Sequence, residues 1–407
     1  MTERTLDDEK VAHDDSGALR RRIGRILDFY YPDCIDSERG GYVAQFDERT
    51  GAVYDSGPRH LVATCRFAAN FSLAARLGIE TDEGGPGEWR EAAAHGLEFL
   101  ESAHRDPERG GYHWLLDGTE PVDERRSPYG HAFVLLAYAR ATEAGVDGVE
   151  SRLHEVADLV EERFVEEDHG LLRSELDADW EPVEPYRGQN ANMHGCEAFL
   201  AAYEATGRDR YLDRALGVAR GITVDLAAET DGLLWEHFTA EWSHDMGYNE
   251  DDPAHQFRPW GYQPGHHLEW AKLLPGLARH RDADWLLSRA EELFEAAVET
   301  GWDEEYGGFY YTVDADGEPV VDDKYGWPVA EGIGAAAALA AATGDDRYRE
   351  WYDRQWEYAA DHLVNDAGNW YSKLTRENEY VDTSGGPAVE PGYHPIGACY
   401  EGLRAFD

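Results

Sequence analysis

Lysine is scarce in this sequence, and a long apolar run is absent. The 407 residues include 37 basic side chains, but only four are lysines (Lys10, Lys272, Lys324 and Lys373), and 83 acidic residues bring the formal net charge to −46. Such a polyanion repels phosphate backbones and anionic lipids, so we expect neither nucleic-acid nor membrane partners. No apolar stretch approaches the roughly 20 residues of a membrane-spanning helix, and the charged segment 1–10 lacks a signal-peptide core.

Cysteine is also rare, which argues against disulfide scaffolds and cysteine-rich metal sites. The four cysteines are scattered without CxxC spacing, as expected of buried thiols in a reduced cytoplasm. The sequence has no Gly-rich phosphate loop, no HExxH and no nucleophile elbow. The acidic run 249–252 is more simply explained as solvated surface than as a cation site. We therefore expect a cytoplasmic protein that needs neither a metal nor a cofactor.

The acidic excess does not indicate disorder, because hydrophobic residues make up 42% of the chain and aromatic residues 12%. At molar salt the Debye length falls to roughly 3 Å, which screens the repulsion between surface charges. The charge and the shortage of lysine together predict a halophilic protein from a salt-accumulating organism. An ordinary acidic protein is the alternative.

A glycine turn with acidic residues before it recurs six times along the chain. Successive turns lie 59 to 76 residues apart, at Gly41, Gly111, Gly170, Gly232, Gly308 and Gly368. Apolar residues at three- and four-residue steps predict helices between the turns, at 88–104, 132–144, 151–165, 197–206, 211–227, 268–279, 285–299, 335–342 and 348–364. Two helices in each of six repeats predict an all-α (α/α)6 barrel with short hairpins at one end. We expect it to span 1–407 as a single catalytic domain, and an open solenoid is the alternative.

Each turn is followed by a polar residue near the start of the next helix. These residues keep the period of the repeat: His60 with Arg66, His131, His194, His266, Glu331 and His394. In a closed ring such positions would face a shared axial cavity. Two of them begin a His-x-x-Glu pattern, which places Glu197 near His194 and Glu269 near His266 on one helix face. A carboxylate can fix the tautomer of an imidazole and raise its basicity, so the pattern predicts proton transfer near neutral pH.

Four segments resemble the N-acylglucosamine 2-epimerase superfamily. They are RHLVATCRFAAN (59–70), NANMHGCEA (190–198), PGHHLEWAKLL (264–274) and GYH (392–394). Within the superfamily, the first and third segments and DPERGGYHW (106–114) are most similar to D-mannose isomerases. The resemblance implies an (α/α)6 barrel that epimerises or isomerises a free sugar without a metal.

The resemblance also implies roles for individual residues. It assigns catalysis to His266, His394 and Glu269, with Glu269 paired to His266, and it places Arg66 near the reacting carbons of the sugar. It implies further substrate-binding residues: His194, Glu197, Asn192, His131, Arg258, Trp327 and Glu331. One departure is that many epimerases have an arginine shortly after the last histidine, whereas Pro-Ile-Gly-Ala-Cys follows His394 here.

These groups suit removal of the C2 proton from an open-chain aldose, which gives an enediolate that cations stabilise. Return of the proton to C1 gives a ketose, and return to the opposite face of C2 gives a 2-epimer. We expect interconversion of D-mannose and D-fructose, with D-lyxose and D-xylulose as a second pair, by a monomer or homodimer. His394 is favoured as the C1/C2 base and His266 with Glu269 for ring opening, although the reverse assignment stays open.

Three other functions are compatible with the sequence. A sugar 2-epimerase acting on N-acetylglucosamine, glucose or a cellobiose-like disaccharide needs the same acid and base groups. An (α/α)6 glycoside hydrolase needs paired carboxylates across a cleft, whereas histidine predominates among the repeated polar residues here. A non-catalytic carbohydrate- or protein-binding toroid would account for the aromatic residues but not for two His-x-x-Glu units.

Overall fold

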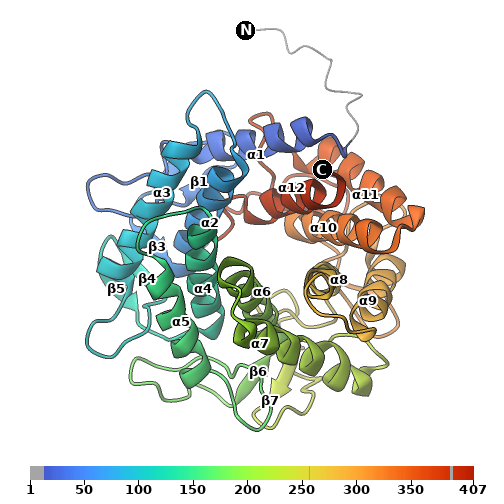
Figure 1. Cartoon of the computed structure of the whole chain (residues 1–407). Coiled ribbons are helices and arrows are strands. Elements are labelled where there is room, and N and C mark those ends of the chain that lie inside the picture. The colour runs from blue at the N-terminus through green and yellow to red at the C-terminus, as the bar shows by residue number, and fades with distance from the viewer. Residues whose placement is uncertain (1–12, 256, 386–387) are drawn as a thin grey trace, which may run out of the picture.

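Two concentric rings of helices form the molecule (Figure 1). The computed structural model describes residues 13–255, 257–385 and 388–407, so Lys10 and the segment 1–10 lie outside it. The inner ring consists of α2 (Leu61–Leu77), α4 (Pro128–Glu143), α6 (Gln189–Thr206), α8 (Pro264–Ala278), α10 (Gly326–Thr343) and α12 (Tyr393–Phe406). The outer ring consists of α1 (Ser16–Tyr30), α3 (Pro86–Phe99), α5 (Glu150–Arg163), α7 (Asp209–Arg220), α9 (Trp285–Gly301) and α11 (Asp346–Tyr358).

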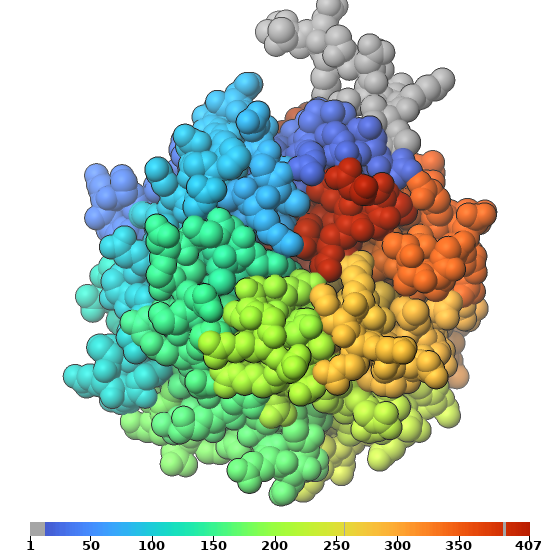
Figure 2. Space-filling model, in the orientation of Figure 1, coloured from blue at the N-terminus to red at the C-terminus, as the bar shows by residue number. Residues whose placement is uncertain are grey.

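The ring is closed, as the (α/α)6 prediction requires. Each outer helix packs on an inner one, and α12 contacts both α2 and α1, which joins the last repeat to the first. In the space-filling view, segments of neighbouring repeats pack against one another around the ring (Figure 2). This closure excludes the open solenoid. Among the described residues, no helix is both long and apolar enough to cross a membrane.

The inner helices begin earlier than the sequence predicts. Those expected at 197, 268 and 335 begin at Gln189, Pro264 and Gly326. Their first turns carry polar side chains, and α2 is buried along nearly its whole length, so neither has the one-sided apolar stripe of a surface helix. The outer helices were predicted more closely. Those predicted at 88–104, 211–227 and 348–364 end in π-helical turns at Leu100–His104, Gly221–Leu226 and Ala359–Leu363.

Short antiparallel strands lie before or between the helices, as the predicted hairpins required. β1 (Gln45–Phe46) pairs with β2 (Val53–Asp55), and β8 (Thr312–Val313) pairs with β9 (Pro319–Val321). The other strands form three sheets: β3 (Pro58–His60), β4 (Leu115–Asp117) and β5 (Glu120–Asp123); β6 (Tyr186–Gly188) and β7 (His237–Thr239); β10 (Lys324–Tyr325) and β11 (Lys373–Leu374). Since β3, β6 and β10 lead directly into α2, α6 and α10, these sheets fix where inner helices begin.

Ion pairs attach the repeated glycine turns to the inner helices. The paired glycines of three turns have φ between 69° and 88°, a left-handed conformation that favours glycine: Gly40–Gly41, Gly110–Gly111 and Gly307–Gly308. The acidic residue of the turn then binds the cation directly before the N-cap of the next inner helix. We call these contacts the junction pairs: Asp36–Arg59 (2.5 Å), Asp106–Arg126 (2.5 Å), Glu166–Arg187 (2.6 Å) and Asp303–Lys324 (3.0 Å).

The four cysteines, Cys34, Cys65, Cys196 and Cys399, are free and buried, as predicted. They lie within one large hydrophobic cluster that includes residues of both rings. The rings thus form a continuous apolar framework in which polar side chains near the axis stand out.

Candidate functional site

The inner helices begin around a cavity of about 250 Å³ on the barrel axis. Six predicted site residues line it: Arg66, His194, His266, Glu269, Trp327 and His394. The walls also include polar and aromatic residues that sequence reasoning missed: Tyr129, Asn190, Gln263, Tyr311 and Glu390. The Trp327 ring lies 5.2 Å from the His266 ring and 5.8 Å from the His394 ring, between their centroids. An apolar ring face thus adjoins both imidazoles.

His394 is held by carboxylates at both ring nitrogens. Its Nδ1 lies 2.7 Å from Glu331 Oε1, and its Nε2 lies 3.4 Å from Glu390 Oε2. Burial lowers the pKa of His394, but these two carboxylates outweigh burial and raise it to about 9. Glu331 is outside the cavity wall and 2% exposed, so it orients the imidazole from behind. His394 is therefore an imidazolium at neutral pH as long as both carboxylates stay in place.

The carboxylate partner of His266 is Glu236, and the predicted pairing with Glu269 is wrong. His266 Nδ1 lies 2.9 Å from both oxygens of Glu236, a buried residue just before β7. Gln189 donates a hydrogen bond to Glu236 and accepts one from Trp270, which fixes the carboxylate. Burial lowers the pKa of His266, but Glu236 outweighs burial and raises it. The i,i+3 spacing did not reveal a partner that is 30 residues away in sequence.

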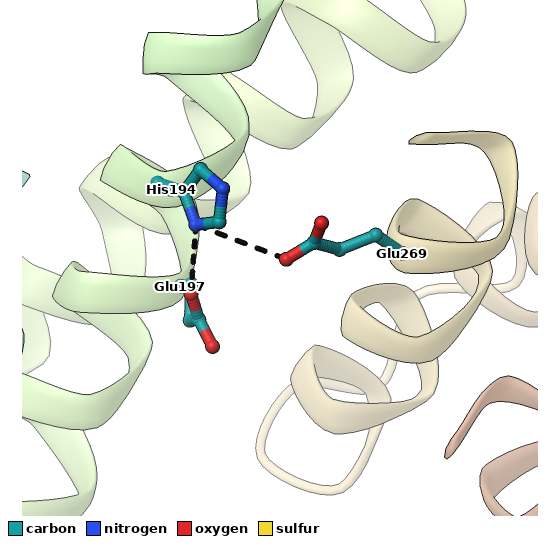
Figure 3. A group of neighbouring side chains, drawn as sticks. All are labelled: His194, Glu197 and Glu269. Atoms are coloured by element: carbon teal, nitrogen blue, oxygen red, sulfur yellow. Dashed lines mark hydrogen bonds and ion pairs between the residues drawn. The ribbon is translucent and has the colours of Figure 1, made fainter. Parts of the chain in front are cut away.

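Glu269 instead lies opposite His194 (Figure 3). His194 Nδ1 is 3.0 Å from Glu197 Oε2, as the His-x-x-Glu pattern predicted, and 3.8 Å from Glu269 Oε1. Glu197 lies behind the histidine and accepts a hydrogen bond from the Tyr393 hydroxyl. Burial and the nearby charge of Glu331 raise the pKa of Glu269. With Nδ1 engaged by Glu197, Nε2 of His194 is the nitrogen available to a ligand.

Arg66 supplies a fixed positive charge beside His394. Its guanidinium donates to Glu390, to the carbonyl oxygen of Val389 (2.9 Å) and to the Tyr129 hydroxyl (3.2 Å), and one nitrogen lies 3.4 Å from His394 Nε2. Burial raises the pKa of Glu390, but Arg66 and His394 outweigh burial and lower it to about 2. Arg66 and His394 thus share one carboxylate, whose side chain is 37% exposed.

Three predicted substrate-binding residues lie outside the cavity wall, and these predictions are wrong. His131 is fully buried, donating from Nδ1 to the Ser127 carbonyl and accepting at Nε2 from the Tyr112 N–H. Asn192 binds the backbone of Leu172 in the next repeat in the same way. These side chains hold the glycine turns in place, as does His267 in the third repeat.

Arg258 is the third such residue. It forms ion pairs with Glu184 and Glu175 and stacks over the Tyr186 ring at 4.2 Å. Its guanidinium is therefore already engaged by two carboxylates outside the cavity wall.

The polar residues predicted to be equivalent occupy different places in their helices. His60 is the N-cap of α2, His131 is four residues beyond the N-cap of α4, and His394 is two beyond that of α12. The position that recurs at the axis is the sixth residue after each N-cap: Arg66, Phe133, His194, Glu269, Glu331 and Ala398. Repeat spacing alone could not separate positions that differ by one helical turn or less.

Two groups of buried side chains could in principle coordinate a cation: His194, Glu197 and Glu269, and Glu269, Glu331 and His394. The Lys272 ammonium, however, contacts Glu331 and lies 3.9 Å from Glu269 Oε1. These carboxylates therefore already share a positive charge that the chain itself supplies.

Known proteins with this architecture include sugar isomerases. A D-mannose isomerase from Marinomonas mediterranea is 42% identical over 97% of this chain and 98% of its own length, and one from Thermobifida fusca is 45% identical over 91% and 89%. The crystal structure of a D-mannose isomerase superimposes with a TM-score of 0.92 at 41% identity, covering 97% of this chain and all of that one. The profile of the N-acylglucosamine 2-epimerase (GlcNAc 2-epimerase) family matches residues 40–398. The chain therefore belongs to the N-acylglucosamine 2-epimerase family.

Proposed function

We propose that this protein is an aldose–ketose isomerase that interconverts D-mannose and D-fructose, with D-lyxose and D-xylulose as a second pair. The observation that carries the proposal is the placement of two carboxylate-held histidines, His266 and His394, on one axial cavity with Arg66 between the inner helices. Similarity to D-mannose isomerases over nearly the whole chain supports the same reaction.

In the proposed mechanism, the C1 and C2 oxygens of the open-chain sugar replace Glu390 on Arg66 and His394. Displacement of this carboxylate lowers the proton affinity of His394, so its imidazole can take the C2 proton. Arg66 stabilises the developing enediolate oxyanion, and His394 returns the proton to C1. His266, oriented by Glu236, exchanges a proton with the ring oxygen to open the sugar.

The remaining groups bind the sugar. Glu269 Oε1 is buried and accepts no hydrogen bond from the described part of the chain, which leaves it available to a sugar hydroxyl. His194 and Trp327 offer a hydrogen-bonding nitrogen and an apolar ring face. Glu197 and Glu331 act from behind, by holding His194 and His394.

The cavity favours a neutral free sugar over a phosphorylated one. Among its described lining residues, Arg66 is the one permanent cation, and Asp47, Glu48 and Glu390 are acidic. A phosphate group would meet these carboxylates without a free counter-charge. We therefore propose a free monosaccharide as the substrate, processed without a metal or cofactor.

The runner-up is a sugar 2-epimerase acting on N-acylglucosamine, glucose or a cellobiose-like disaccharide. It requires proton return to the opposite face of C2, for which His266 is the available group. Incubation with D-mannose, D-lyxose, D-glucose, N-acetylglucosamine, cellobiose and mannose 6-phosphate distinguishes these reactions. We expect ketose from the first two sugars; aldose epimers as the main products would replace isomerase by epimerase.

We further propose that residues 1–407 act as one catalytic domain, as a monomer or homodimer, in the cytoplasm of a halophile. The net charge of −46 supports this setting, because repulsion within such a surface is relieved by concentrated salt. Light scattering and activity in a KCl series test the oligomeric state and the salt requirement. Full stability in dilute buffer would contradict the halophilic assignment.

A further inference from the structure

Beneath the cavity, Lys272 lies among carboxylates from three inner helices. Its side chain is 11% exposed, and its ammonium contacts Glu331, which is 2% exposed. Glu269, 1% exposed, is 3.9 Å away on the same helix. The ionisable groups around this cluster come from four helices: Glu269 on α8, Glu331 on α10, Glu197 and His194 on α6, and His394 and Tyr393 on α12.

This cluster separates two cavities. A second cavity of about 70 Å³ is lined by Lys272, Glu197 and Glu331, together with the later parts of the inner helices. The charged groups therefore form a partition across the axis and do not belong to the solid apolar packing of the two rings. Gly334 leaves room for the lysine stem, because a Cβ there would lie 3.1 Å from Lys272 Cδ.

Two buried carboxylates this close to each other cannot both stay ionised without a cation. Burial and the charge of Glu331 raise the pKa of Glu269, whereas Lys272 and His394 overcome burial and lower the pKa of Glu331. The ammonium is kept charged in turn, since the carboxylates outweigh burial and raise its pKa.

We propose that Lys272 is a positioning residue for the isomerase reaction, whose ammonium lets Glu269 and Glu331 remain ionised together on either side of it. Glu331 can then hold His394 as a carboxylate, and Glu269 can accept a hydrogen bond from the sugar. This inference rests on the proposed function only for its consequence in catalysis, since the charge balance concerns the free protein.

Lys272→Met removes the charge and keeps most of the side-chain volume. Infrared spectra recorded against pH, variant minus wild type, report the C=O stretch of protonated carboxyl groups. We expect Lys272→Met to gain this band at a pH at least about one unit higher than wild type, because a neighbouring cation at about 4 Å is lost. Added Glu269→Gln or Glu331→Gln should remove the gained band.

Two controls separate charge from packing. Lys272→Arg keeps the charge and should keep the wild-type titration. Arg281→Met removes a cation from the exposed Arg281–Asp213 pair and should change neither the band nor the activity. In Lys272→Met we also expect kcat to fall at neutral pH with KM nearly unchanged, and the acid limb of the kcat profile to move to higher pH.

A second variant keeps the test decisive if Lys272→Met does not fold. Glu331→Gln leaves the ammonium to Glu269 alone, so Glu269 should take up its proton at a lower pH than in wild type. Unchanged carboxyl titration in either variant would overturn the role of Lys272. If the wild type converts no free sugar, the proposed function fails, whatever these titrations show.

Discussion

The residue directly before the N-cap of an inner helix and the residue six positions after that N-cap differ in how much they vary. Before the N-cap, four of the six repeats have a cation in a junction pair: Arg59, Arg126, Arg187 and Lys324. Six residues after the N-cap, the same helices carry arginine, phenylalanine, histidine and two glutamates, and alanine in the last. The two positions are two turns apart on each helix, yet one repeats and the other does not.

This difference separates construction from chemistry. The junction has to perform the same task in each repeat, which is to anchor a glycine turn and begin a helix. The axial position faces a cavity whose chemistry needs an acid, a base and a cation at different points. A repeat can therefore build the ring with one kind of residue and build the site with several.

The largest expected effect is on catalysis at the axis. His394→Ala and His266→Ala should each lower kcat by about 10²–10⁴-fold, the usual contribution of a general acid or base. The matched control is His131→Asn, because Asn192 already performs the same turn-binding task in the next repeat. Steady-state kinetics on folded protein should show a large loss in the first two variants and near wild-type kcat in the third. A loss of equal size in His131→Asn would abolish the distinction between the two positions.

The next effect is on stability at a junction. Arg126→Met leaves the Asp106 carboxylate, 5% exposed, without its cation, which should cost about 3–5 kcal/mol in free energy of unfolding. Denaturant titration measures this loss, and kcat of the folded fraction should stay within about twofold. Unchanged stability would show that the junction pairs do not hold the ring together.

Glu390→Gln tests the carboxylate shared by Arg66 and His394. The pKa of His394 should fall below its value of about 9, since Glu390 is the main group that raises it. If neutral His394 is the base, kcat/KM in wild type rises with pH up to that pKa, and the rise should occur at lower pH in the variant. Because the pKa is raised above 6.5, His394 stabilises the fold below that pH, and this contribution is lost as pH rises through about 9. An unmoved pH profile would remove Glu390 from the account.

The smallest effect is expected at the surface. Arg281→Met breaks an exposed pair (2.7 Å; side chains 43% and 61% exposed) and should change stability by less than about 1 kcal/mol. The whole protein should nevertheless gain stability as KCl is raised toward molar concentration, because screening relieves the net charge of −46. Thermal unfolding in a KCl series measures both effects. A variant loss comparable to that of Arg126→Met would contradict the difference between buried and exposed pairs.

The sequence predicted the ring because each repeat announces itself locally, through a glycine turn and helical periodicity. It predicted six cavity residues from repeat position and family resemblance, among them His266 and His394. It could not find Glu236 or Glu390, since neither lies at a regular distance from the histidine that it contacts. Nor could it separate His131 from His194, because backbone bonding and cavity lining differ by two positions on a helix that is buried along most of its length.

The most direct test of the account is the fate of the C2 proton of D-mannose. With D-mannose in deuterated water and molar KCl, NMR should show D-fructose forming, with any solvent deuterium in the product at C1. His394→Ala should stop both turnover and label uptake. Unchanged and unlabelled D-mannose, or D-glucose labelled at C2 as the main product, would contradict the account.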